Sequence, residues 1–100
     1  MKAVLAGTVI AEADDSDLIS IEGNWYFPLS AVEDGVLVES STPYTCPWKG
    51  EAQYYSVVVD GQTYADRAWG YPHPYASAFE RVGKDISAHI AFAPDVEVGP

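Results

Sequence analysis

Basic side chains are scarce in this sequence. Its 100 residues include five lysines and arginines against fifteen aspartates and glutamates, for a formal net charge of −10. A nucleic-acid-binding protein normally presents a basic face to the phosphates, and an anionic membrane surface attracts clustered basic residues. The basic residues here are few and scattered: Lys2, Lys49, Arg67, Arg81 and Lys84. We therefore expect neither nucleic acid nor a membrane as a partner.

Cysteine and long apolar runs are also lacking. Cys46 is the only cysteine, which excludes an internal disulfide and a zinc site built from several cysteines of one chain. Two histidines without a fixed spacing from carboxylates are a weak metal signal, so we predict no metal and no other cofactor. No apolar run approaches the roughly 18 residues that span a bilayer. Residues 1–7 read as a strand and not as a signal peptide, so we expect a cytoplasmic protein.

The remaining composition is that of a globular domain. Hydrophobic residues make up 48% of the chain, which argues against disorder. A chain of this length buries roughly 60–65% of the surface that its unfolded form exposes, which is enough for one core. No linker, repeat or low-complexity tract interrupts it. We predict a single domain over residues 1–100.

Turn signals at short spacing predict a mainly β protein. Ala6-Gly7, Gly23-Asn24 and Asp60-Gly61 each separate two apolar segments, as in β-hairpins. We expect about seven strands in a compact twisted antiparallel sheet that curls into an open barrel. The expected strands cover residues 4–5, 8–11, 18–22, 25–27, 36–38, 51–59, 62–65 and 86–92, with 96–98 extending the sheet.

One helix is expected in the C-terminal region. Apolar residues at helical spacing predict it from about Tyr75 to Val82, and Gly83 is suited to end it. A single helical turn is also expected between residues 29 and 34, capped by Ser30.

Two irregular segments concentrate the residues that could carry chemistry. The first segment (residues 45–50) reads Thr-Cys-Pro-Trp-Lys-Gly, and the second segment (residues 68–74) reads Ala-Trp-Gly-Tyr-Pro-His-Pro. Pro72 and Pro74 exclude a central strand, so the second segment is predicted to be an extended loop. Loops on a rigid β scaffold often hold binding sites.

We predict a ligand pocket between these two segments. Lys49 would hold an anionic group, and aromatic side chains would clamp the rest of a small molecule. Cys46 would be a nucleophile or a wall of the pocket, because a cation three residues away favours the thiolate. The alternative is that Cys46 is a small buried hydrophobe, Lys49 is solvated and the aromatic residues are core. The candidate ligand-binding residues are Cys46, Trp48, Lys49, Tyr54, Trp69 and Tyr71, with Cys46 the candidate catalytic residue.

The two histidines are weaker candidates. His73 lies between two prolines and could act as a base near neutral pH, but we favour an exposed loop histidine without such a role. His89 falls opposite the apolar positions of its expected strand, so we expect it in solvent.

Several segments of the sequence resemble the DUF427 family of small bacterial proteins, whose function is unknown. The resemblance rests on residues 4–11, 22–28, 68–72 and above all 45–57, which read T-C-P-W-K-G-E-A-Q-Y-Y-S-V. It implies a compact, mostly β fold of the β-tent kind with a helix near the C-terminus. β-Tent relatives often hold zinc through two cysteine pairs, which this chain lacks. Gly70 stands where the family often has a bulkier residue, and residues 75–85 look atypical.

The resemblance leaves the function open. A nucleotidyltransferase label has been attached to the family, but the Gly-Ser and paired aspartates typical of such enzymes are absent here. We expect a small-molecule-binding domain, and the sequence leaves open whether it is an enzyme. The alternative is a non-catalytic interaction domain that forms a homodimer through exposed strand edges. A thiol-sensing role for Cys46 would need a partner outside the chain.

Overall fold

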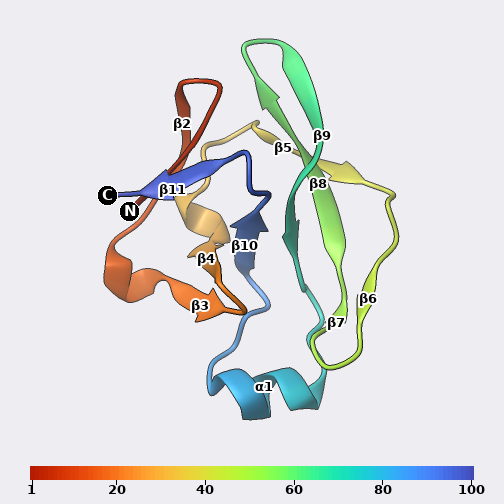
Figure 1. Cartoon of the computed structure of the whole chain (residues 1–100). Coiled ribbons are helices and arrows are strands. Elements are labelled where there is room, and N and C mark those ends of the chain that lie inside the picture. The colour runs from red at the N-terminus through yellow and green to blue at the C-terminus, as the bar shows by residue number, and fades with distance from the viewer.

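A six-stranded antiparallel sheet runs through the middle of the molecule (Figure 1). The structure is a computed structural model and describes residues 1–100. The strands follow the order β3 (Ile19–Ile21), β4 (Asn24–Pro28), β10 (His89–Phe92), β9 (Gln62–Gly70), β8 (Gln53–Val59) and β5 (Leu37–Ser40). Strands β3 and β5 are the edges, so the sheet is open.

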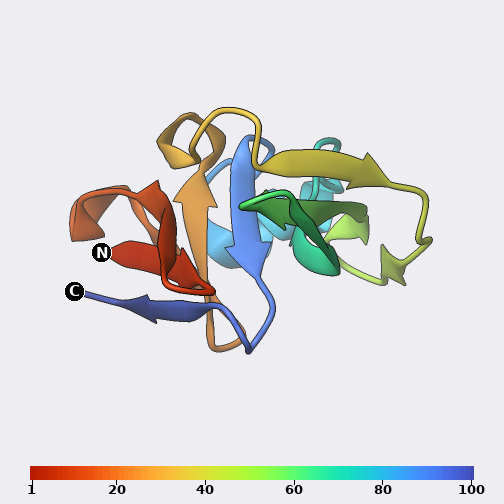
Figure 2. The same ribbon diagram turned by 90° about the horizontal axis from the view of Figure 1, so that it is seen from above.

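A smaller sheet joins the two ends of the chain. It has the order β11 (Glu97–Gly99), β1 (Lys2–Leu5) and β2 (Thr8–Glu12), with Lys2 opposite Gly99. Seen from above, both termini lie together on one side of the large sheet (Figure 2). A third pairing is short and joins β6 (Thr45–Cys46) to β7 (Gly50–Glu51).

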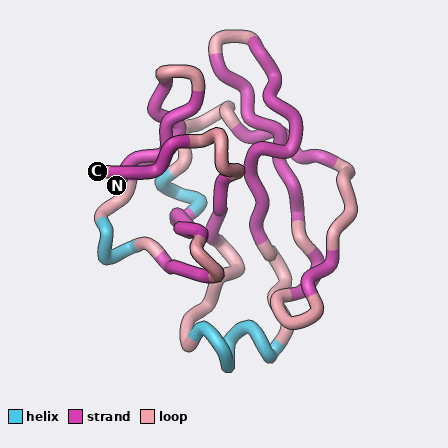
Figure 3. The backbone as a smooth tube through the Cα atoms, in the orientation of Figure 1, coloured by secondary structure: helices cyan, strands magenta, loops and turns pink.

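Helical structure is minor (Figure 3). The helix α1 (Ala76–Val82) ends at Gly83, whose φ of 77° belongs to the left-handed region that glycine adopts without strain. Two 3₁₀ turns, η1 (Asp15–Asp17) and η2 (Leu29–Ala31), complete the fold. None of these helical elements has the length and apolar character needed to cross a bilayer.

Three tight hairpins organise the sheets. At residues 6–7, 22–23 and 60–61 both turn residues have positive φ, and the second is glycine each time. This is the type I′ geometry whose twist matches that of paired strands. The predicted turn at Gly23-Asn24 is therefore off by one residue, because Ile21 pairs with Asn24. The shift places Glu22 at the tip of the β3–β4 hairpin.

The large sheet has a separate core on each face. On one face, the rings of Phe27 and Phe92 are in edge-to-face contact, with their centroids 5.7 Å apart, and both pack against the smaller sheet. The core on this face also holds Ala3, Leu5, Ile10, Ala11, Leu18, Val57, Val59, Ala68, Ile90 and Val96. On the other face, side chains of the sheet pack against α1 and the first segment. This second core consists of Ile19, Ile21, Tyr26, Cys46, Tyr71, Ala78, Ile86 and Ala91.

The prediction of a mainly β fold with one helix at residues 76–82 is confirmed. The structure has eleven strands, where about seven were expected, because several strands have only two or three residues. The prediction of a loop over all of residues 68–74 is wrong. Strand β9 continues to Gly70 and pairs on both sides, since the prolines that interrupt pairing come only at positions 72 and 74. Ser30 does not cap η2, which starts after Pro28 without a side-chain cap.

Gly70 is required by close packing against β10. A Cβ atom built on Gly70 would lie 2.7 Å from the His89 carbonyl oxygen, a backbone atom that cannot move aside cheaply. We expect Gly70→Ala to lower the free energy of unfolding by about 1–3 kcal/mol, measured by urea denaturation. Gly99→Ala is the matched control, because a Cβ there meets nothing within 4 Å. Equal stability of the two variants would contradict this packing.

Candidate functional site

The two segments meet through their backbones. The Tyr75 amide donates a hydrogen bond to the Lys49 carbonyl oxygen at 3.1 Å. Gly50 has a φ of +119°, and a Cβ on it would lie 3.2 Å from the His73 carbonyl oxygen. Such a close approach in this conformation favours glycine. The first segment is therefore fixed against the turn that leads from β9 into α1.

Lys49 lies at the centre of this junction. Its side chain is only 7% exposed, and its Nζ lies 4.7 Å from the centroid of the Trp48 ring and 5.3 Å from that of Tyr71. The ammonium donates a hydrogen bond to the carboxylate of Glu22, at the tip of the β3–β4 hairpin. The Glu22 side chain itself is 57% exposed. The amine is thus covered by aromatic rings on the inside and by a carboxylate on the outside.

The surroundings of Lys49 keep it charged. Burial disfavours the ammonium, but the hydrogen bond to Glu22 and the nearby Tyr26 and Cys46 outweigh burial and raise the Lys49 pKa above its ordinary value. A buried ammonium needs such a partner, because an unpaired buried charge costs several kcal/mol by general experience. Most of this positive charge is therefore already compensated within the protein.

Of the other candidate residues, Cys46 and Tyr71 are buried in the core, and Trp48, Tyr54 and Trp69 are half-buried. The Trp69 indole N–H donates to the Tyr26 hydroxyl at 3.1 Å, and the rings of Tyr54 and Trp69 lie 6.1 Å apart. Burial raises the pKa of Tyr71, which is only 3% exposed, so its phenol stays neutral. Cys46 is also 3% exposed. The structure brings the predicted residues together, but mainly as core.

The histidines occupy different surroundings. His73 is exposed, as expected. The expectation of a solvated His89 is wrong, because this side chain is half-buried and its Nδ1 has no hydrogen-bond partner. Burial lowers the pKa of His89 accordingly.

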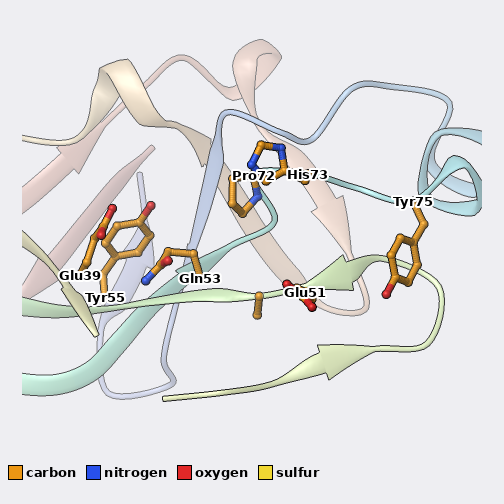
Figure 4. A pocket seen from close by; sticks show the side chains of 8 residues that line it. Glu39, Glu51, Gln53, Tyr55, Pro72, His73 and Tyr75 are labelled. Carbon is orange, nitrogen blue, oxygen red and sulfur yellow. The ribbon is translucent and has the colours of Figure 1, made fainter. Parts of the chain in front are cut away.

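A cavity of about 520 Å³ opens beside the junction, on the side of Glu51 and His73. In Figure 4, Glu39 and Tyr55 lie at one end and Tyr75 at the other, with Glu51 between them and His73 on the opposite wall. None of the ligand-binding residues predicted from the sequence lines this cavity. Its lining consists of Glu39, Glu51, Ala52, Gln53, Tyr55, Pro72, His73 and Tyr75.

The charge of the cavity is negative. Two carboxylates line it, no lysine or arginine does, and neither Glu39 nor Glu51 takes part in an ion pair. The pKa of Tyr55 is raised by burial and then by the charge of Glu39, which lies opposite Tyr55 in the β5–β8 pairing. No group of three or more histidine, cysteine, aspartate and glutamate side chains is placed to hold a metal ion. The arrangement is suited to an organic cation.

Sequence reasoning missed these lining residues. Glu39 and Glu51 are twelve positions apart and look like ordinary solvated carboxylates in the sequence. The register that sets Glu39 opposite Tyr55 brings Glu39 to the cavity. The available signal was that Glu51 directly follows the first segment and that His73 belongs to the second.

Comparison with known families agrees with this fold. A family model described as a domain of unknown function, DUF427, matches residues 1–99, and the chain belongs to that family. No curated protein matches the chain.

We expect the Lys49–Glu22 pair to contribute to stability. Glu22→Gln leaves the buried ammonium with a neutral acceptor, so we expect the free energy of unfolding to fall by about 1–3 kcal/mol. Asp95→Asn is the control, since its pair with Arg67 is exposed and contributes less than about 1 kcal/mol. Urea denaturation at neutral pH measures both.

The loss of stability caused by Glu22→Gln should depend on pH in a definite direction. Because the folded-state pKa of Lys49 is raised, the stabilisation is fully present below about pH 10.4 and is lost as pH rises through the higher folded value. The gap between wild type and Glu22→Gln should therefore hold from neutral pH to about pH 9 and narrow above about pH 10.5. A gap that widens at alkaline pH would contradict a charged, paired Lys49.

Burial predicts an unreactive Cys46. With 3% of the residue exposed, a thiol reagent reaches it only when the structure opens. We expect labelling in native buffer to be at least about 100-fold slower than in concentrated guanidinium. Equal rates would restore the nucleophile hypothesis for Cys46.

Proposed function

We propose that this domain binds a small organic cation in the cavity beside the junction of the two segments. The observation that carries the proposal is the lining of the cavity, with two unpaired carboxylates, two tyrosine rings and no lysine or arginine. Ligand sites of small molecules commonly have several hundred Å³ of space, aromatic walls and a few polar groups.

The negative charge of the cavity favours a cationic ligand over an anionic one. An anion held by Lys49 was expected from the sequence, but that amine is buried and already paired with Glu22. The cavity offers carboxylates instead, on a chain with a formal net charge of −10 that attracts cations from solution. Tyr55 and Tyr75 add aromatic faces, which attract ammonium groups.

The position of the carboxylates favours an elongated ligand. Glu39 lies opposite Tyr55, and Glu51 precedes Tyr55 by four residues along nearly the same extended segment. At the strand rise per residue, this separates the backbones of the two ends by roughly 13 Å. A linear diamine would place one ammonium group near each carboxylate, with its methylene chain along Gln53 and Pro72.

Binding is proposed without a reaction. The titratable groups that line the cavity are two carboxylates, His73 and two phenols, and no serine, threonine or cysteine is among them. A base and a ligand site would be present, but the cavity offers no serine or threonine hydroxyl and no cysteine thiol as a nucleophile.

A second proposal is self-association. The edge strand β5 exposes half of Val38 and has an unpaired side, which is the usual starting point for strand addition between copies. Light scattering of the wild type and of Val38→Lys decides this question. A dimer that dissociates in the variant supports it, and a monomeric wild type removes it.

The cation proposal is tested with 1,8-diaminooctane in isothermal titration calorimetry. We expect saturable binding, weakened about fivefold by Glu39→Gln and by Glu51→Gln, because each removes one exposed charge pair. 8-Amino-1-octanol has the same length with one charge, and it should bind less tightly. Glu97→Gln is the matched variant, since Glu97 is an exposed carboxylate on β11 outside the cavity.

Two outcomes would remove the proposal. One is the absence of saturable binding. The other is an equal loss of affinity in Glu97→Gln and Glu51→Gln, which would indicate attraction to the overall negative charge and no specific site.

A further inference from the structure

Trp48 lines a second hollow. It has a volume of about 380 Å³ and lies between β3 and the C-terminal end of α1. Its floor is apolar and includes Ile19, Ile21 and Val82. The groove shares no lining residue with the cavity that holds Glu39 and Glu51.

Basic side chains gather around this groove. The Arg81 guanidinium carbon lies 5.0 Å from the centroid of the Trp48 ring, and the Lys49 Nζ lies 4.7 Å from it. Lys84 lines the groove as well. Two of the five basic residues of the chain therefore lie at the Trp48 indole and a third lines the same groove, although the formal net charge is −10.

Two basic side chains of the groove have no carboxylate partner. Arg81 and Lys84 form no ion pair, although the chain has fifteen carboxylates. Glu22 is the only carboxylate that lines the groove, and its charge is engaged by Lys49. The position of Arg81 in the last turn of α1 suits the helix dipole, but this does not require the guanidinium to lie over an indole. Two free positive charges remain above an apolar floor.

We propose that this groove binds an aryl oxyanion, a carboxylate or phosphate attached to a flat apolar ring. The ring packs on Ile19, Ile21 and Val82 beside Trp48, and the oxyanion meets Arg81 and Lys84. Guanidinium groups bind such anions through paired hydrogen bonds. The proposal does not depend on the cation site, because the two sites have opposite charge and different residues.

The experiment is a ¹H–¹⁵N NMR titration of the whole chain with 2-naphthoate and, separately, with 2-naphthyl phosphate. The three indole N–H signals, from Trp25, Trp48 and Trp69, report the location of binding. We expect a saturable shift of the Trp48 signal, while the signal of Trp25, which does not line the groove, stays in place. Either anion that binds in this way supports the proposal, and the tighter one identifies the head group. The neutral 2-naphthamide should bind more weakly.

Charge-matched variants make the test specific. Arg81→Gln and Lys84→Gln should each weaken binding about fivefold. Lys2→Gln removes a cation of β1 that forms no ion pair and does not line the groove, so it should leave affinity unchanged. All these positions are exposed, so the folds should persist. Equal binding of 2-naphthamide, equal losses in Lys2→Gln and Arg81→Gln, or no saturable shift of Trp48 would each overturn the proposal.

Discussion

The buried ammonium of Lys49 is the constraint on which the rest of the structure depends. A charge that is removed from water must be paired, and the chain meets this need with Glu22, twenty-seven positions away at the tip of the β3–β4 hairpin. The type I′ turn places that carboxylate over the first segment. The pair therefore joins the first segment to the edge of the large sheet, and the Tyr75–Lys49 backbone hydrogen bond joins it to the turn before α1.

This arrangement explains why the core around Lys49 is closed and the hollows lie beside it. The rings of Trp48 and Tyr71 lie beside the Lys49 ammonium, and Trp69 packs against the same core. The carboxylates of Glu39 and Glu51 line one hollow, and Arg81 and Lys84 line the other. The two hollows share no lining residue and differ in charge, and we propose a different class of small molecule for each.

Much of the fold follows from local signals in the sequence. Dipeptides that contain glycine marked the three hairpins, with the second turn placed one residue too late, and the spacing of apolar residues before Gly83 marked the helix. Residues 68–70 were missed because Pro72 and Pro74 act only on their own neighbours, whereas pairing with β8 and β10 is a long-range property. The proximity of the two segments was predicted correctly. The Glu22–Lys49 pair and the meeting of Glu39 with Tyr55 depend on strand register, which no local pattern encodes.

The central claim is that Lys49 is a charged amine held inside the protein by Glu22, and NMR of lysine side-chain ammonium groups tests it most directly. The chain has three lysines, and Lys2 and Lys84 are exposed. Exposed ammonium protons exchange with water too fast to be observed near neutral pH, whereas buried and hydrogen-bonded ones exchange slowly. We expect one persistent ammonium signal in the folded protein, assigned to Lys49 and lost in Lys49→Met. The absence of any such signal in the folded wild type would contradict it.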